Sequence, residues 1–206
     1  PEHNIVRRFE LAAARAAHAA GVSPAVRHWE EGALVIEFIE GRTLQPEDVR
    51  DPANLERLAE LLRRCHHGIP RHYRGPAPIF WVFQVLRDYG HRLRETASPY
   101  ASDLPRLAEI AGRLEAEVGP VEIVFGHNDL LPANLIDDGE RLWLVDWEYA
   151  GFNSPLFDLG GLASNAAMSA EARAALIEAY FRRRPDADLL RRSAAMTAAS
   201  LLRETM

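Results

Sequence analysis

The stretch HNDLLPANLIDDGERLWLVD, residues 127–146, decides the fold of this chain. It holds Asp138-Gly139 between two apolar-rich runs, and this dipeptide predicts a two-residue turn because both central residues must tolerate a positive φ angle. The sequence therefore predicts a hairpin that Asn134 opens and whose second strand delivers Asp146. Oxygen-bearing side chains then stand at the edges of one small sheet.

The register of this hairpin decides how far apart these side chains lie. With a two-residue turn, Asn134 pairs near Trp143, and Asp146 lies roughly 10 Å further along at ~3.3 Å per residue. An upstream run, Val121–Phe125, is predicted to be the strand that feeds the loop carrying Asp129. We therefore expect this loop to curl back over the open end of the hairpin.

Three of these side chains suit phosphoryl transfer. Transfer from a nucleotide needs Mg²⁺ held by protein oxygens and water. It also needs a carboxylate that orients the acceptor hydroxyl and takes its proton. The pattern H-x-D-x-x-x-x-N followed by a strand-terminal Asp predicts both, with Asp129 as the base and Asn134 and Asp146 as metal ligands. His127 is interpreted as a brace for its loop and not as a proton carrier.

Residues 127–134 and the segment 145–151, which reads VDWEYAG, resemble a known family. They are similar to the choline/ethanolamine kinase branch of the aminoglycoside phosphotransferase-like, or protein kinase-like, family. In protein kinases the equivalent of Asp146 begins an Asp-Phe-Gly motif, whereas this chain has Asp-Trp-Glu-Tyr-Ala, as that branch does. Single motifs produce false matches, and the alternative is an Asp-rich hairpin that caps its own turns.

The resemblance implies an α+β, protein kinase-like fold with two lobes. Residues 1–40 are expected to form a partial N-terminal, nucleotide-binding lobe of short strands and one helix, which ends in the hinge. Residues 41–206 are expected to form a mostly helical C-terminal lobe with the catalytic loop and the metal-binding hairpin.

The resemblance also implies an enzyme that uses ATP and Mg²⁺ to phosphorylate the hydroxyl of an amino alcohol, choline or ethanolamine. Other acceptors remain open, namely an aminoglycoside, thiamine or homoserine. Two functions of other classes remain as alternatives. One is a non-catalytic, kinase-like binding module, and the other is a metal-dependent phosphoesterase that uses His127 and Asp129.

The composition excludes several classes of protein. The net charge is -6, so the sequence lacks the excess of basic residues that is typical of a nucleic-acid binder. All 24 Lys and Arg residues are Arg. Cys65 is the single cysteine, so no internal disulfide can form, and we expect a cytoplasmic protein. No stretch approaches the length of a membrane span. The expected partner is a small-molecule alcohol, with no nucleic acid and no membrane, and the oligomeric state stays open.

The N-terminal region contains three further candidates. Glu10 lies in the first turn of an Ala-rich helix predicted over Phe9–Ala20, where an acidic residue suits the helix dipole. The resemblance implies instead that Glu10 pairs with the basic residue that contacts the phosphates. A hairpin is predicted over Val26–Ile39, and the resemblance makes its end the hinge, where main-chain groups of Glu37 and Ile39 bind adenine. The alternative is an ordinary edge strand.

The central region is predicted to be helical. A helix begins at Asp51-Pro52 and ends near His66-His67-Gly68, which we interpret as a solvated helix end because adjacent helical positions point about 100° apart. A loop is predicted for residues 70–78. A second helix is predicted over residues 79–94, and a third runs from Ser102 to Val118.

The remaining candidates concern the acceptor and the loop. Aromatic stripes on helices are more often core, but the resemblance implies that Trp81, Tyr89 and Glu148 contact a cationic substrate. Residues 147–155 are predicted to be a loop, followed by an apolar helix that Asp158 joins in its first turn. This carboxylate either complements the helix dipole or, as the resemblance implies, accepts hydrogen bonds from the catalytic loop. Two more helices are predicted, over about 169–184 and 186–206.

Two features of the resembled family are missing from the sequence. No Gly-rich phosphate loop precedes Glu10, and the strand with the basic phosphate contact would lie before Pro1. The resemblance also implies further aromatic-bearing helices beyond Met206, and we therefore expect a chain that is incomplete at both ends. An intact mass near 23.1 kDa would show that nothing is missing.

Overall fold

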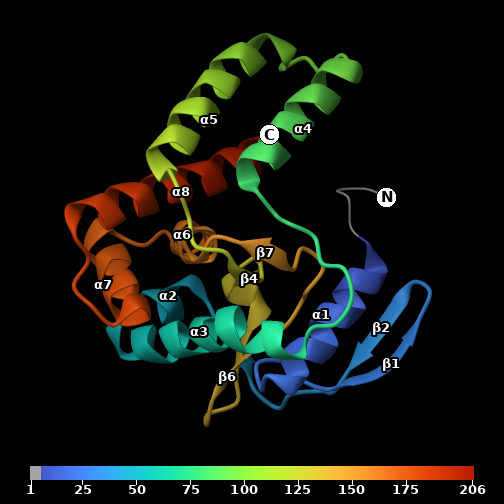
Figure 1. The fold of residues 1–206 in the computed structure, drawn as a ribbon. Helices are drawn as coiled ribbons and strands as arrows, with labels where there is room; N and C mark the ends of the chain where they lie inside the picture. The colour runs from blue at the N-terminus through green and yellow to red at the C-terminus, as the bar shows by residue number, and fades with distance from the viewer. Residues whose placement is uncertain (1–5) are drawn as a thin grey trace.

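Helices make up most of the computed structural model, which describes residues 6–206 (Figure 1). The helices are α1 (Arg7–Ala19), α2 (Pro46–Arg50), α3 (Leu55–His72), α4 (Val82–Glu95), α5 (Leu104–Val118), α6 (Pro155–Asn165), α7 (Ala170–Phe181) and α8 (Ala187–Thr205). Short 3₁₀ turns cover Pro52–Asn54, Ala101–Asp103 and Pro132–Asn134. The strands are β1 (Val26–Glu30), β2 (Ala33–Ile36), β3 (Arg42–Thr43), β4 (Val124–Gly126), β5 (Leu135–Asp137), β6 (Leu142–Leu144) and β7 (Gly151–Asn153).

The strands of residues 6–206 form small antiparallel sheets, with β1 paired to β2, β3 to β5 and β6, and β4 to β7. Helix α1 packs beside the β1–β2 hairpin and on α3 (Figure 1). Helices α4 and α5 form an antiparallel pair that packs on α8, which in turn packs on the central α6. No helix in residues 6–206 is long and apolar enough to cross a bilayer.

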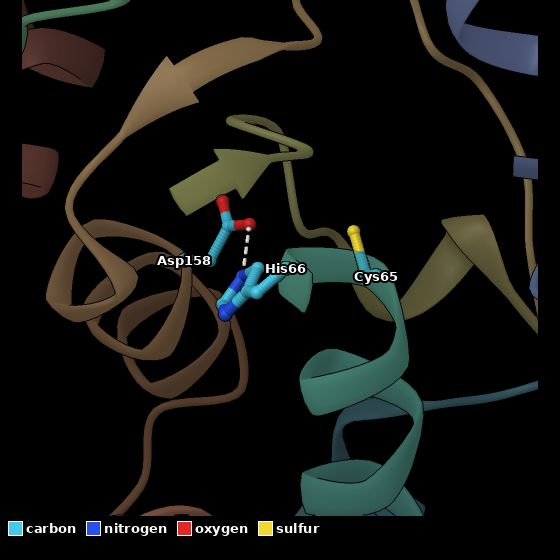
Figure 2. A group of neighbouring side chains, drawn as sticks. All are labelled: Cys65, His66 and Asp158. Carbon is cyan, nitrogen blue, oxygen red and sulfur yellow. Dashed lines mark hydrogen bonds and ion pairs between the residues drawn. The ribbon is translucent and has the colours of Figure 1, made fainter. Parts of the chain in front are cut away.

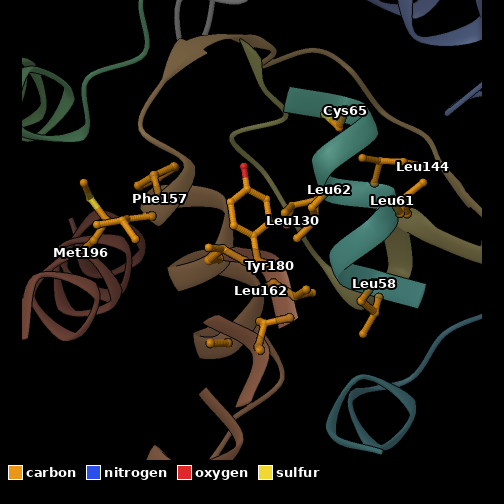
Figure 3. Close-up of a cluster of buried hydrophobic side chains, with 14 of the residues drawn as sticks. Leu58, Leu61, Leu62, Cys65, Leu130, Leu144, Phe157, Leu162, Tyr180 and Met196 are labelled. Atoms are coloured by element: carbon orange, nitrogen blue, oxygen red, sulfur yellow. The ribbon is translucent and has the colours of Figure 1, made fainter. Parts of the chain in front are cut away.

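The core forms where α3 meets the helices that follow the hairpin. Leu58, Leu61, Leu62 and Cys65 recur at the spacing of one helix face and are at most 1% exposed. Figure 3 shows this face beside side chains of α6, α7 and α8. Helix α6 approaches α8 closely, because a Cβ at Gly160 would lie 3.0 Å from the Thr197 nitrogen.

Helix α3 ends later than the sequence predicts. It runs to His72, through Gly68 and Pro70, so both the predicted end at residues 66–68 and the predicted loop from residue 70 are wrong. Ile69 is fully buried and its carbonyl accepts from the Tyr73 N–H at 2.9 Å. Pro70 lies in the last turn, where its missing N–H removes one intrahelical bond, and the burial of Ile69 and Tyr73 on either side offsets that loss.

The central hairpin has a four-residue loop and not the predicted two-residue turn, because Asp137 faces Leu142. The carboxylate of Asp138 organises this loop. It accepts from the N–H groups of Glu140 and Arg141 at 2.9 and 2.8 Å, and from the indole of Trp143 at 2.7 Å. The Arg141 backbone bond and then the Trp143 bond lower the pKa of Asp138 to about 2.

The longer loop shifts the register by two residues relative to the prediction. Asn134 therefore faces Val145 and not Trp143, and the Val145 N–H donates to the Asn134 carbonyl at 3.0 Å. The predicted 10 Å separation is wrong for this reason, since Asp146 directly follows the residue opposite Asn134. Residues 147–155 also differ from the predicted loop, because β7 pairs with β4 there.

The other predicted helices are confirmed with small shifts. Helix α4 begins at Val82 and not at residue 79, because Ile79 forms a parallel bridge with Phe152. Helices α5, α6, α7 and α8 lie where the sequence predicts them. Helix α1 and the β1–β2 hairpin also match their predictions to within a few residues at each end.

Candidate functional site

The loop that follows β4 is hydrogen-bonded to a buried carboxylate on α6, that of Asp158. Asp158 is 1% exposed, and its Oδ2 accepts from the His127 N–H while its Oδ1 accepts from the Asn128 N–H, both at 2.8 Å. These are the backbone hydrogen bonds that the resemblance implies for Asp158. They fix the start of the candidate catalytic loop to the first turn of α6.

His66 completes this brace from α3 (Figure 2). Its Nε2 lies 3.0 Å from Asp158 Oδ2 and its Nδ1 lies 2.7 Å from the hydroxyl of Tyr180. The prediction of a solvated helix end is therefore wrong for His66, which is 1% exposed. Sequence reasoning missed it because its carboxylate partner stands 92 residues later and not at helical spacing.

Electrostatics keep this buried carboxylate ionised. Burial by itself raises the pKa of Asp158, but the hydrogen bond and charge of His66, together with His127, outweigh it, and the pKa is lowered. A buried carboxylate without such partners would be neutral. Asp158 therefore carries its charge as the acceptor of the loop's N–H groups.

Cys65 lies beside this pair, and ligand atoms of Cys65, His66 and Asp158 lie within 4.8 Å of one another (Figure 2). Burial raises the pKa of the Cys65 thiol well above its usual value, and the charge of Asp158 raises it further. The Cys65 Sγ donates to the Phe125 carbonyl at 3.8 Å, and both Asp158 oxygens already accept backbone hydrogen bonds. The cluster acts as a hydrogen-bonded brace.

His127 joins the loop to the end of β6. Its Nε2 lies 2.9 Å from the Val145 carbonyl, its Nδ1 lies 3.3 Å from the Asp129 nitrogen, and its ring packs on Trp147 at 4.9 Å. The side chain is fully buried. These contacts fit the predicted brace.

Asn128 is a site residue that the sequence analysis did not single out. Its φ of 68° lies in the left-handed region, which few residue types other than Gly adopt. Its amide nitrogen donates to the carbonyls of Tyr149 and Gly151 at 3.0 and 3.2 Å, and its Oδ1 accepts from Asn153 at 3.1 Å. Asn128 thus ties the loop to the segment that follows Asp146.

The candidate base and metal ligands meet at the open end of the hairpin. The Asn134 side-chain nitrogen donates to the Asp129 carbonyl at 3.0 Å, which directs its Oδ1 away from that bond. Asp146 follows Val145 with a φ of 69° and an exposed carboxylate. One amide oxygen and one carboxylate are hard oxygen ligands of the kind that Mg²⁺ prefers. The side chains present therefore fit a magnesium ion.

A cavity of about 520 Å³ opens beside Asp129. Its lining includes Asp129 and two of the three predicted substrate residues, Tyr89 and Glu148, and the full set is Tyr89, Arg92, Leu93, Asp129, Leu131, Glu148, Tyr149, Arg203, Glu204 and Met206. Burial raises the pKa of Glu148, and the charge of Asp146 raises it further. The cavity thus combines aromatic faces and carboxylates next to the candidate base.

Trp81, the third predicted substrate residue, lines a different cavity of about 310 Å³. Its indole nitrogen donates to Glu115 Oε1 at 2.7 Å. Tyr89, Glu148 and Tyr149 line both cavities, so the two cavities adjoin at these residues, and Asp129 lines only the first and Trp81 only the second.

The candidates of the N-terminal region lie on α1 and after β2. Among the described residues, the cation that bonds to Glu10 is Arg7, at 2.8 Å and one turn earlier, and Arg7 also reaches Glu148 at 3.2 Å. The Glu37 N–H donates to the Ala25 carbonyl at 2.8 Å. Within residues 6–206, the backbone of Ile39 takes part in no backbone–backbone hydrogen bond.

Arg203 on α8, like His66 and Asn128, was not predicted from the sequence. It donates to Asp129 Oδ1 at 3.0 Å and lines the larger cavity. The two residues are 74 positions apart, and no local pattern connects them.

Known proteins are similar to this chain in both sequence and fold. A family model described as choline/ethanolamine kinase matches residues 2–181. The chain is 29% identical over 181 residues to protein LicA of Haemophilus influenzae, covering 85% of this chain and 66% of that protein. It is 34% identical over 167 residues to ethanolamine kinase 2 of Mus musculus, covering 76% of this chain and 41% of that protein.

The fold resembles a solved structure closely. A choline/ethanolamine kinase family protein from Mesorhizobium loti superimposes with a TM-score of 0.84 and 32% identity, covering 100% of this chain and 70% of that chain. The chain thus spans between 41% and 66% of the length of the two curated relatives above. The likeness confirms the predicted α+β, protein kinase-like fold.

Proposed function

Because the chain belongs to the choline/ethanolamine kinase family, we propose that it transfers the γ-phosphate of ATP to the hydroxyl of an amino alcohol, choline or ethanolamine. One observation carries the proposal. The hairpin register sets Asp146 directly after the residue that faces Asn134, and the same Asn134 bonds to the backbone of Asp129. The loop that carries the proposed base is therefore bonded to the end of the sheet where the two proposed oxygen ligands lie.

Each of these residues has a proposed role. Asn134 Oδ1 and the Asp146 carboxylate hold Mg²⁺, which neutralises charge on the phosphates of the bound nucleotide. Asp129 orients the acceptor hydroxyl towards the γ-phosphorus and takes its proton. His127 and Asp158 touch no substrate in this proposal, and they position the loop through the hydrogen bonds described above.

The larger cavity is the proposed acceptor site. Its carboxylates and aromatic rings suit an ammonium group, since cations bind over aromatic faces and pair with carboxylates. Glu148 and the rings of Tyr89 and Tyr149 are the proposed contacts. We keep Trp81 outside this set, because it lines the other cavity and its indole N–H is bonded to Glu115.

The nucleotide is proposed to lie between an N-terminal lobe of residues 1–40 and a C-terminal lobe of residues 41–206. The backbone of Ile39 supports a hinge contact for adenine, because it makes no backbone–backbone hydrogen bond within residues 6–206. Glu37 offers its carbonyl alone, because its N–H already bonds to Ala25. Glu10 is proposed to orient a phosphate-contacting cation from the N-terminal lobe.

An acceptor panel tests the function. Purified protein is incubated with Mg-ATP and, in separate reactions, choline, ethanolamine, an aminoglycoside, thiamine and homoserine, and phosphorylated product is measured by mass spectrometry. Product with choline or ethanolamine alone supports the proposal. Product with another acceptor overturns the acceptor assignment. Mg-ATP binding without product from any acceptor supports a non-catalytic module, and phosphate release from an ester without nucleotide supports a phosphoesterase.

A further inference from the structure

Arg203 makes a two-point contact with the loop that carries the candidate base. Its Nη2 donates to Asp129 Oδ1 at 3.0 Å, and its Nη1 donates to the Asn128 carbonyl at 3.1 Å. The Nε group donates to Glu204 Oε1 at 3.0 Å, and Nη2 shares the same carboxylate. One edge of the guanidinium thus holds the loop, and the other edge is held by Glu204.

The surroundings fix the position of this guanidinium. The Arg203 side chain is 12% exposed. Its Cζ lies 5.7 Å from the ring centroids of Phe80 and Tyr149 and 5.9 Å from that of Phe157. Aromatic faces attract a guanidinium at these distances and restrict its rotamers. Arg203 therefore presents a preorganised fork and not a mobile surface charge.

We propose that Arg203 is a positioning residue for Asp129, an inference that rests on the proposed function. Arg203 engages Oδ1, so Oδ2 is the oxygen that faces the acceptor hydroxyl. During transfer the hydroxyl proton moves to Asp129 Oδ2, a bond forms between the hydroxyl oxygen and the γ-phosphorus, and the bond from that phosphorus to ADP breaks.

Positioning is a large part of catalysis in this reaction. Phosphoryl transfer passes through a loose transition state, in which orientation of the acceptor matters more than the strength of the base. A displacement of about 1 Å costs on the order of 100-fold in rate. Arg203 holds one oxygen of the Asp129 carboxylate and also the carbonyl of the preceding residue, Asn128. These two bonds limit both the rotation and the translation of the Asp129 carboxylate.

A second arginine on α8 provides the matched control. Arg192 donates through its Nε to the Val118 carbonyl at 2.7 Å and also bonds to the Pro120 carbonyl. It therefore anchors α8 to α5 without touching the loop. Arg192→Met tests the loss of an α8 anchor, whereas Arg203→Met tests the loss of an anchor and of the Asp129 contact.

Steady-state kinetics separate positioning from structure. We expect Arg203→Met to lower kcat about 100-fold with little change in either KM, and guanidinium or ethylguanidinium in the buffer to restore part of it. Arg203→Lys keeps the charge, but a single ammonium group cannot reach both the Asp129 carboxylate and the Asn128 carbonyl. Its kcat should therefore lie between those of the wild type and Arg203→Met. It also serves if Arg203→Met fails to fold. A kcat for Arg203→Met no lower than that of Arg192→Met, or no rescue, would overturn the proposal.

A second readout does not depend on turnover. The side-chain carboxyl ¹³C signal of Asp129, assigned through Asp129→Asn, is compared in the wild type and in both Met variants. We expect it to shift in Arg203→Met and to stay in place in Arg192→Met. A wild type that phosphorylates no acceptor refutes the proposed function, whereas an unmoved Asp129 signal in Arg203→Met refutes the positioning contact.

Discussion

The Val145 N–H donates to the Asn134 carbonyl at 3.0 Å, and this bond sets the geometry of the site. The Val145 carbonyl lies 2.9 Å from His127 Nε2. One residue therefore fastens both the hairpin and the loop that carries Asp129. Asp146 follows immediately with a left-handed φ of 69°. Strained backbone of this kind is costly and persists where the surroundings determine it, often at functional sites.

The buried brace should be a main source of loop stability. Asp158→Asn leaves one amide N–H₂ facing the His127 or Asn128 N–H, so a buried donor loses its acceptor. We expect the free energy of unfolding to fall by about 3 kcal/mol, measured by urea denaturation. Asp188→Asn is the control, because Asp188 also lies in the first turn of a helix but is 57% exposed and should cost under about 1 kcal/mol. Equal losses would refute the brace.

The stability difference between the wild type and Asp158→Asn should depend on pH. The folded pKa of Asp158 is below its ordinary value of 3.8, so its contribution is complete above that value and is lost as pH falls through the folded pKa. The stability difference between wild type and Asp158→Asn should therefore be constant near neutral pH and shrink below about pH 4. A difference that grows on acidification would have the wrong sign.

Adjacent histidines on α3 should behave differently. His66→Leu removes one of the buried hydrogen bonds of the Asp158 carboxylate and the 2.7 Å bond of the Tyr180 hydroxyl, and each loss costs roughly 1–3 kcal/mol. His67 is exposed and its Nε2 lies at 3.5 Å from the Tyr180 hydroxyl, so His67→Leu should cost under about 0.5 kcal/mol. Thermal unfolding of the two variants decides the point, and similar melting temperatures would contradict the assignment.

Two glycines should respond to Ala with opposite signs. At Gly126 a Cβ would lie 2.7 Å from Asn128 Oδ1 and 3.3 Å from Asp158 Oδ2, so Gly126→Ala should cost about 1–3 kcal/mol. At Gly112, within α5, a Cβ meets nothing within 4 Å, so Gly112→Ala should stabilise by roughly 0.5–1 kcal/mol. Chemical denaturation of both variants measures this. A neutral Gly126→Ala would mean that the loop tolerates movement.

Magnesium should stabilise the protein through Asp146. In the presence of ATP, added Mg²⁺ should raise the melting temperature and EDTA should reverse the rise, as ligand binding adds about 2.7 kcal/mol at 100 times Kd. Asp146→Ala should lose the Mg²⁺-dependent part. Glu140→Ala, which removes an exposed carboxylate from the hairpin loop, should keep it. An Asp146→Ala protein with the full magnesium response would exclude this ligand.

Local sequence signals predicted the helices and the hairpin because the interactions that specify them are local. The predicted turn length was wrong because of the Asp138 side chain. Its carboxylate accepts hydrogen bonds from two backbone N–H groups and from the Trp143 indole, and these bonds favour a four-residue loop. Strand β7 was missed because it has three residues and its partner β4 is distant in sequence.

The residues of the candidate site also fall into two groups, those that a local motif predicts and those that tertiary packing brings together. Asp129, Asn134 and Asp146 belong to one contiguous motif, and the hairpin register brings Asn134 and Asp146 together. His66 and Arg203 belong to no such motif, since each meets its partner only after α3, α6 and α8 pack. Their long-range hydrogen bonds are set by tertiary structure, which a local pattern does not encode.

Turnover and nucleotide affinity of Asp129→Asn, measured side by side, test the central claim most directly. The variant keeps the size of the side chain and both proposed Mg²⁺ ligands but removes the proposed base. We predict that phosphorylation of choline or ethanolamine falls by about 10²–10⁴-fold, while the Kd for Mg-ATP stays at the wild-type value. An equal loss of turnover and of nucleotide affinity would contradict the assignment of Asp129 as the residue that orients the acceptor.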